Sequence, residues 1–270
     1  MPDVYATITE ADEATQVQLA DVLELRASDL QQRAMLHDYL GDVAFPRGAG
    51  VLEIGCGTGP VSRVLAGWPG VERVVGIDPS PVLLDRARTL GASVPNLSFE
   101  EGDGRRLPFA DESFDVVVCH TSLCHIPEPQ SVLAEAWRVG RPGGWVAIFD
   151  GDYATTTVAT GDHDPLQMCA DAAMAALVHD RWLVRRLPAL ADAAGFDVVR
   201  LRSHGYTETA EPHYMQTIVE RGADALLAAD RIGAELAGEL KAEARRRVAA
   251  GSFFGHIAYA SLIARRRRAG

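Results

Sequence analysis

Short apolar runs alternate with amphipathic stretches over the first 150 residues of the chain. The runs are apolar on both faces, which is typical of parallel strands buried between two layers of helices. They cover residues 49–55, 71–78, 97–103, 114–120 and 145–150. The stretches between them have helical spacing, and Ser80 followed by Pro81 is a typical helix start. They cover residues 60–68, 80–92 and 129–144. This alternation predicts an α/β fold with a doubly wound sheet.

The pattern changes at both ends of the chain. Residues 15–42 are expected to form one helix that ends at Gly41. Beyond residue 150, two long helical stretches alternate with two further strands. In chain order these segments are residues 163–196, 197–206, 212–251 and 253–266. The helical stretch before the last strand is too long for a hairpin connection. It is therefore expected to be an insertion that covers one end of the sheet.

The segment VLEIGCGTGP, residues 51–60, places glycines at alternate positions directly after a strand-like run. A glycine turn before a helix exposes backbone N–H groups and a positive dipole end, and it allows close approach of a ligand. Dinucleotides and S-adenosylmethionine are both bound by such turns. The dinucleotide pattern needs Gly or Ala at position 60, where this chain has proline, which lacks an N–H and adds a ring. The proline therefore weakens the dinucleotide interpretation, whereas S-adenosylmethionine carries no phosphate.

This segment resembles the first motif of class I S-adenosylmethionine-dependent methyltransferases. The resemblance extends in ordered blocks over residues 49–150 and is strongest to the branch that methylates small molecules such as quinones, sterols and natural products. It implies a Rossmann-like fold with a seven-stranded, mostly parallel sheet whose last strand is antiparallel. It also implies a helical N-terminal cap over residues 1–48 and a methyltransferase domain over residues 49–270. Within that domain, a helical lid insertion is expected at about residues 211–250.

The resemblance assigns the cofactor contacts to residues at the ends of the expected strands. Glu53 would orient the glycine turn and the amino group of the ligand. Asp78 would accept hydrogen bonds from the ribose hydroxyls, and Asp103 would reach the adenine amino group. The N-terminal segment would close over the ligand, with Arg26 on its carboxylate. The expected cofactor-binding set is Tyr5, Arg26, Glu53, Gly55, Cys56, Gly57, Gly59, Asp78, Pro79, Asp103, Gly104 and His120.

Methyl transfer from a sulfonium is an in-line displacement, so the protein mainly has to align the acceptor with the methyl group. A base is needed only when the acceptor is protonated. His120 directly follows the fourth expected strand, at the sheet edge where α/β proteins bind ligands, and histidine titrates near neutral pH. His120 is therefore the first candidate for a base and His125 the second. The alternatives are that His120 only packs against the cofactor and that His125 lines the pocket.

Five residues outside this region are candidates for orienting the acceptor. Asp152 and Tyr153 are expected in a loop after the fifth strand, and His163 lies in a loop that could cap the site. Tyr206 ends the sixth strand, and Tyr214 opens the inserted helices. The alternative for each of them is a lining or surface position without a role in the chemistry.

The cysteines give no evidence for a metal site. The four of them show no C-x-x-C spacing. Cys119 and Cys124 bracket the expected site, where arsenite-binding thiols are one interpretation and small buried thiols another. We favour the second, because nothing else in the chain matches an arsenite site, and no metal is expected.

Composition changes this interpretation mainly by exclusion. The net charge of −11 makes nucleic acid and membrane surfaces poor partners, so the expected partner is a small-molecule acceptor. The chain shows no signal peptide and no membrane-spanning run, which favours a cytoplasmic location with reduced thiols. The basic run at residues 265–268 is expected to be a solvated tail. The sequence does not determine the oligomeric state, and a homodimer or higher homo-oligomer is compatible with it.

Four functions remain open at this point. The leading one is methylation of a natural-product or quinone-like acceptor of secondary metabolism. The second is a protein of the same fold that binds S-adenosylmethionine but catalyses a cyclisation or decarboxylation. A nicotinamide oxidoreductase is the third, and Pro60 argues against it. The last is a regulator that senses the cofactor without turnover.

Overall fold

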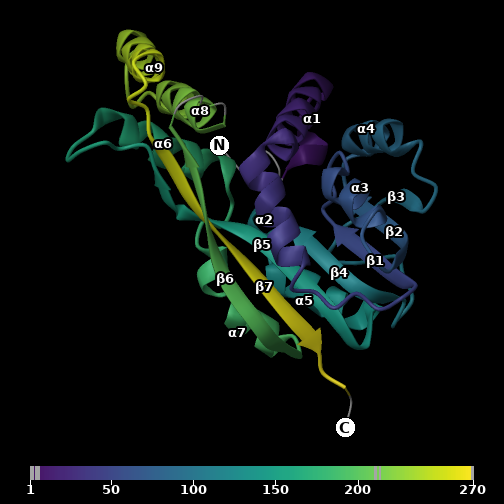
Figure 1. Ribbon diagram of the computed structural model, residues 1–270. Helices are drawn as coiled ribbons and strands as arrows, with labels where there is room; N and C mark the ends of the chain where they lie inside the picture. Colours follow the sequence, from purple (N-terminus) through teal and green to yellow (C-terminus); the bar gives the residue numbers. More distant parts are fainter. Residues whose placement is uncertain (1–2, 4–6, 210–211, 213, 269–270) are drawn as a thin grey trace.

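A sheet of seven strands organises the computed structural model, which describes residues 3, 7–209, 212 and 214–268 (Figure 1). Within these residues the strand order is β3-β2-β1-β4-β5-β7-β6, and β7 alone runs antiparallel to its neighbours. The expected doubly wound, mostly parallel sheet is confirmed. The strands are β1 (Ala49–Ile54), β2 (Val71–Asp78), β3 (Leu97–Glu101), β4 (Phe114–His120), β5 (Gly140–Thr157), β6 (Phe196–Glu208) and β7 (Gly255–Arg266).

Helices flank the sheet and extend beyond one of its ends (Figure 1). The helices α3, α4 and α5 connect parallel strands, whereas α8 and α9 form the insertion between β6 and β7. The insertion packs on α6 through α8. The α-helices are α1 (Glu13–Ser28), α2 (Leu30–Leu40), α3 (Pro60–Ala66), α4 (Pro81–Gly91), α5 (Pro129–Val139), α6 (Pro165–Leu177), α7 (Leu187–Ala193), α8 (Tyr214–Ala228) and α9 (Ala234–Ala249). Short 3₁₀ turns are η1 (Ile8–Glu10), η2 (Leu123–His125) and η3 (Leu183–Arg185).

The single helix expected over residues 15–42 is wrong, because the chain forms α1 and α2 with a break at Asp29. Asp29 adopts an extended conformation, and its carboxylate accepts a hydrogen bond from the backbone N–H of Gln32 at 2.9 Å. An aspartate that caps a new helix in this way competes with continuation of the old one. The break lets α1 pack on α3 and α4 while α2 contacts β5 and β6.

The strand β5 is longer than its apolar run predicts. The expected strand ended at residue 150, but the ladder with β7 continues through Asp152 opposite Ala258 to Thr157 opposite His256. The expectation that Asp152 and Tyr153 belong to a loop is therefore wrong. Alternation between buried and half-buried positions replaces the continuous apolar run in this part of the strand, and the long partner strand β7 supplies the hydrogen bonds.

The basic run at the C-terminal end is partly structural rather than a solvated tail. Arg266 belongs to β7, is 8% exposed and donates to the backbone oxygen of Gly140. Its guanidinium lies 3.9 Å from the centre of the Trp137 ring, a cation–π geometry. Arg267 pairs with Asp192 and Asp197. These contacts fix the end of the last strand onto α5 and α7.

The core lies around the central strands β1, β4 and β5. Leu52, Val116 and Phe149 are fully buried there, as expected for strands covered by helices on both faces. Because β1, β2 and β4 are parallel, their carboxyl ends meet at one edge of the sheet. Ligands bind at this edge in open α/β sheets. Across the described part of the chain, no helix has the length and apolarity needed to cross a membrane.

Candidate active site

The glycine turn between β1 and α3 has a conformation that suits glycine. Gly55 and Gly57 have φ angles of 72° and 53°, in the left-handed region that side chains disfavour. A Cβ on Gly55 would lie 2.6 Å from the Cβ of Ser122, and one on Gly57 would lie 2.9 Å from Leu23. The N–H of Gly55 donates to the backbone oxygen of Ile77 at 2.8 Å. The turn is therefore held against β2 with its surface bare of side chains.

Asp78 ends β2 beside this turn. Its carboxylate accepts hydrogen bonds from the N–H of Gly57 at 2.9 Å and of Ser80 at 3.0 Å, and the residue is 7% exposed. Burial raises the pKa of Asp78 to about 6, against the opposing effect of these two bonds. Each carboxylate oxygen retains a lone pair, so Asp78 can also accept hydrogen bonds from two adjacent hydroxyls. A ribose presents such a pair.

Glu53 is an acid inside the sheet. It is 2% exposed, and the hydroxyl of Ser62 donates to its carboxylate. Burial raises the pKa of Glu53 to about 8, and the negative charge of Asp78 acts in the same direction. Two buried carboxyl groups at one edge thus lack a cation strong enough to keep both ionised. A ligand with an ammonium or sulfonium group would supply that positive charge. S-adenosylmethionine carries both groups, so these two acids fit this cofactor.

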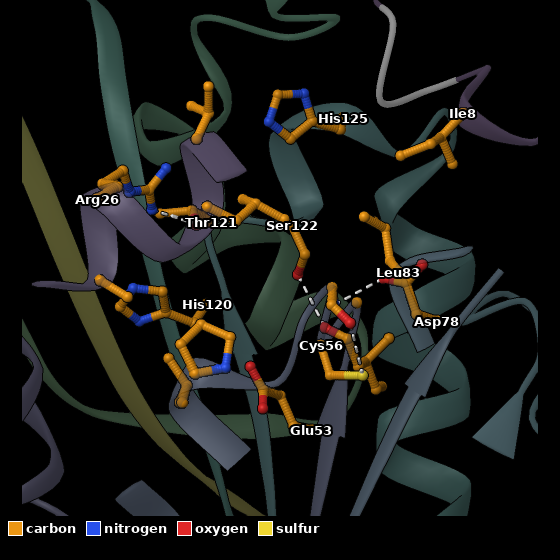
Figure 2. Close-up of a pocket in the computed structure, with 18 of the residues that line it drawn as sticks. Ile8, Arg26, Glu53, Cys56, Asp78, Leu83, His120, Thr121, Ser122 and His125 are labelled. Carbon is orange, nitrogen blue, oxygen red and sulfur yellow. Dashed lines mark hydrogen bonds between the residues drawn. The ribbon is translucent and has the colours of Figure 1, made fainter. Parts of the chain in front are cut away.

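A cavity of about 770 Å³ opens beside these groups. This size lies in the upper part of the range for small-molecule sites. Figure 2 shows Arg26 and His120 on one side of the cavity, Asp78 on the other, and Glu53 between them. Most of the expected cofactor residues line it. These are Arg26, Glu53, Gly55, Cys56, Gly57, Asp78, Pro79, Asp103, Gly104 and His120.

One of the expected cofactor residues, Gly59, lies outside the cavity wall. Gly59 is the residue before α3 and does not line the cavity, and Phe99 occupies the space where its side chain would be. Its role is to let the turn approach β3 closely. Tyr5 lies outside the described residues. Asp103 does line the cavity, but it forms a bidentate pair with Arg105, whose hydrogen bonds lower the pKa of Asp103.

The surroundings of His120 disfavour its protonated form. Its ring stacks on Phe149 with centroids 4.8 Å apart, and its Nδ1 lies 3.0 Å from the hydroxyl oxygen of Tyr39. Burial lowers the pKa of His120 to about 3, and the positive charge of Arg26 contributes. A neutral imidazole with so low a pKa is a weak proton acceptor at pH 7. The ring is fixed as part of the cavity wall.

His125 connects the N-terminal segment to the site. Its Nδ1 lies 2.7 Å from the carboxylate of Asp3, which also accepts a hydrogen bond from the N–H of His179 at 2.7 Å. His125 lines the cavity. Its observed contacts place it at the junction of η2, the N-terminal segment and the loop after α6.

The structure separates the five acceptor candidates. Tyr153 and Tyr214 line the cavity. Asp152 does not, and it pairs with Arg185 at 2.8 Å. Tyr206 is buried and donates to Glu208, and His163 is exposed outside the cavity.

Helix α1 is attached directly to the glycine turn. Glu24 accepts hydrogen bonds from the hydroxyl of Thr58 at 2.6 Å and from the guanidinium of Arg63 at 2.7 Å. The hydroxyl of Ser80 donates to the side chain of Gln16 at 2.7 Å. These contacts place α1 over the end of the cavity that Asp78 occupies.

Four polar residues are among those of the site that the sequence prediction missed. Thr121 and Ser122 follow His120 directly, so their position at the end of β4 was a usable signal. Ser122 donates to the backbone oxygen of Ile54 at 3.0 Å and packs on Gly55. Gln32 and Arg221 also line the cavity, from α2 and α8. Nothing in their local sequence marks them.

Comparisons with known proteins agree with this geometry. Residues 52–148 match the family model described as "Methyltransferase domain". The methyltransferase GfsG of Streptomyces halstedii is 34% identical over 161 residues, covering 56% of this chain and 54% of that protein. Demethylmenaquinone methyltransferase of Deinococcus radiodurans is 39% identical over 101 residues, covering 37% of this chain and 42% of that protein. The chain thus spans about half the length of the curated relatives it matches.

Solved structures share the fold over more of the chain. A putative methyltransferase from Bacillus halodurans superposes with a TM-score of 0.63 at 21% identity, covering 86% of this chain and 98% of that one. The [4+2]-cyclase SpnF superposes with a TM-score of 0.56 at 20% identity, covering 88% and 82%. The matching segment, the fold and the glycine turn lead to one conclusion: residues 52–148 form a methyltransferase domain of the class I fold, for which S-adenosylmethionine is the cofactor.

Proposed function

We propose that the protein transfers a methyl group to a small organic acceptor, a natural-product or quinone-like metabolite. One observation carries this proposal most strongly. The cavity that the cofactor residues line continues to a second wall made by Tyr153, Tyr214 and apolar residues of α6 and α8. A cavity with room beyond the cofactor residues fits two reactants side by side.

The cofactor supplies a methyl group already activated by a positively charged sulfur, so the chain's own contribution is alignment and exclusion of water. Met174, Leu177 and Ile218 present apolar surface to the acceptor side of the cavity. The neutral ring of His120 and the tyrosines add flat walls. Burial keeps the pKa of Tyr153 well above its usual value, so its hydroxyl stays protonated and can donate a hydrogen bond to an acceptor.

His120, the first candidate for a base, has its pKa lowered to about 3 by burial. We call the part of the cavity at the glycine turn and the ends of β1 and β2 the cofactor half, and the part lined by Tyr153, Tyr214 and the side chains of α6 and α8 the acceptor half. The two acids whose pKa values lie near neutrality, Glu53 and Asp78, belong to the cofactor half. The proposed acceptor is therefore a group that attacks without a strong base, such as a carboxylate, a phenolate or a neutral amine. The net charge of −11 supports a small molecule over nucleic acid or anionic lipid.

The names of two relatives support methyl transfer, and the name of one solved structure supports the alternative reaction. The names of the relatives from S. halstedii and D. radiodurans describe methyltransferases, the second acting on demethylmenaquinone. SpnF is named as a cyclase, so the same fold also serves another reaction. We retain the cyclase-type activity only as the alternative, since the curated relatives we compare are named as methyltransferases.

The deciding experiment follows the fate of the methyl group. Purified protein is incubated with methyl-labelled S-adenosylmethionine and panels of phenols, carboxylates and amines. Label in an acceptor, together with equimolar S-adenosylhomocysteine, supports the proposal. An acceptor converted without loss of S-adenosylmethionine would instead support the alternative. Binding of a pyridine dinucleotide in place of S-adenosylhomocysteine would reject both.

A further inference from the structure

Arg221 is a cation on the cavity wall for which the structure provides no acid. It lies on α8, is half-buried and lines the cavity. The acids of the same helix face α9 instead, since Glu220 pairs with Arg245 at 2.8 Å and Asp224 with Lys241 at 2.5 Å. Among the described residues, no carboxylate forms an ion pair with Arg221. A guanidinium stays charged, and a partly desolvated one favours an anionic partner.

The other acids of the cavity are already engaged. Glu24 pairs with Arg63, and Asp103 pairs with Arg105. The remaining two acids are Glu53 and Asp78 of the cofactor half. Arg26 and Arg221 both act on Tyr214: burial raises the pKa of Tyr214 and the two positive charges oppose the rise, whereas the negative charge of the buried Glu208 adds to it. Glu208 is itself engaged, since it accepts hydrogen bonds from the hydroxyl of Tyr206 and from the backbone N–H groups of Tyr214 and Met215.

Gln32 adds a second unfilled contact. The residue is 5% exposed, lines the cavity from α2, and its amide nitrogen donates to the hydroxyl of Tyr259 at 3.4 Å. Its carbonyl oxygen Oε1 is buried and accepts no hydrogen bond from any described residue. A buried acceptor without a donor is unfavourable, and a ligand that donates a hydrogen bond would satisfy it.

Aromatic and apolar side chains line the same cavity as these two groups. Tyr153 is 3% exposed and lies edge-on to Tyr259, with ring centroids 6.2 Å apart. Tyr214, Met174 and Ile218 complete the surface. Flat aromatic rings pack well against such walls in offset or edge-to-face geometry.

We propose that the acceptor is an aryl carboxylic acid whose carboxylate binds Arg221 and whose ring hydroxyl or amino group donates a hydrogen bond to Gln32. This inference rests on the proposed function, because it assigns the anion to the molecule that receives the methyl group. Arg26 donates to the hydroxyl of Thr121 and lines the cavity, where it is the residue expected on the carboxylate of the cofactor. The charge of Arg221 is then matched by the acceptor alone.

The test compares matched probes by calorimetry on protein saturated with S-adenosylhomocysteine and on protein without it. Benzoate and benzamide have the same shape and differ in charge. Benzoate is expected to bind at least tenfold more tightly, because a charge-assisted hydrogen bond is stronger than a neutral one. Arg221→Gln is expected to abolish this preference. Arg246→Gln, which removes an exposed cation that pairs with Glu243 of α9 itself, is expected to keep it. The inference is overturned if benzoate does not bind, shows no preference over benzamide, or keeps its preference in Arg221→Gln.

A second comparison tests Gln32. At least one of the three hydroxybenzoate isomers is expected to bind severalfold more tightly than benzoate, and Gln32→Met is expected to remove that gain while keeping the benzoate preference. A gain that persists in Gln32→Met, or no gain for any isomer, rejects the role of Gln32. Titration with S-adenosylhomocysteine separates the two proposals. If it fails to bind while benzoate binds through Arg221, methyl transfer is rejected and the anion site stands. If it binds normally without a benzoate preference, only the acid assignment falls.

Discussion

The cofactor half and the acceptor half of the cavity are built in different ways. The cofactor half comes from β1, β2, β4 and the turns directly after them, so neighbours in space are close in sequence or lie on adjacent strands. The acceptor half gathers Gln32, Tyr153, Leu177 and Arg221 from four separate elements. The first half is specified by local motifs, whereas the second exists only once distant elements pack together. Its chemistry can therefore vary while the cofactor half stays the same.

The two halves also differ in charge balance. The cofactor half holds two buried carboxyls with raised pKa values, and the acceptor half holds the guanidinium of Arg221, which pairs with no carboxylate in the described part of the chain. Each half lacks the charge that its proposed ligand would bring. Substitutions of single residues can test both the construction of the two halves and their charge balance.

Glu53 should make the ligand-free protein less stable as pH rises. Its folded-state pKa of about 8 lies above the ordinary value of 4.5 for the unfolded chain, so the folded state retains a proton that the unfolded chain releases. Its favourable contribution is present below pH 4.5 and is lost as pH rises to 8, by about 4 kcal/mol between pH 5 and 8. Urea unfolding across this range measures the slope. Glu53→Gln should flatten it, whereas the exposed control Glu72→Gln should not. An unchanged slope in Glu53→Gln would contradict the assignment.

Gly55→Ala should damage the turn on which the cofactor half depends. Alanine at a φ of 72° costs about 1–2 kcal/mol, and contact with Ser122 adds a similar amount, for a total of about 3 kcal/mol. Thermal unfolding and titration with S-adenosylhomocysteine should both show the loss. Gly238→Ala is the control, because its Cβ would meet open space in α9. Equal behaviour of the two variants would mean that the turn tolerates a side chain.

Asp78→Asn should weaken S-adenosylhomocysteine binding by about thirtyfold, or about 2 kcal/mol. It keeps the size of the side chain and removes the charge that strengthens each hydrogen bond it accepts. Calorimetry measures the affinity, and Asp85→Asn on the exposed face of α4 provides the control. Wild-type affinity in Asp78→Asn would separate Asp78 from the ribose.

Glu24→Gln tests whether α1 belongs to the cofactor half. The change removes the half-exposed pair with Arg63 and weakens the bond from Thr58, so cofactor affinity should fall by about 1 kcal/mol. Asp21→Asn on the same helix should have no effect, since its nearest cation, on Arg86, is 3.9 Å away and both are exposed. If both variants bind S-adenosylhomocysteine like the wild type, α1 contributes no binding energy.

His120 should have the smallest signature of all in a pH profile. With a pKa of about 3, it should add no inflection to kcat/KM between pH 5 and 8. His120→Gln should therefore leave the shape of the profile unchanged in this range, even if the rate falls because the stack with Phe149 is lost. An inflection near pH 6.5 that disappears in His120→Gln would restore His120 as the base.

Features that depend on a short stretch of sequence could be predicted, and features that depend on contacts between distant elements could not. Asp78 and Gly57 could be placed because a strand followed by a glycine turn fixes their positions within a few residues of chain. The length of β5 could not be predicted, because Asp152 and Tyr153 become part of a strand only by pairing with β7 more than one hundred residues later. The break at Asp29 had a local signal, an aspartate three residues before the glutamine N–H that it caps.

The sequence by itself determined the alternation of strands and helices, the glycine turn and the acids that follow the strands, because these depend on short-range patterns of polarity and backbone freedom. Only the tertiary structure decided that burial holds His120 neutral and that, among the residues it describes, Gln32 keeps an unfilled acceptor and Arg221 forms no ion pair. Burial and charge balance are sums over neighbours brought together from the whole chain. Such sums have no counterpart in any single stretch of sequence.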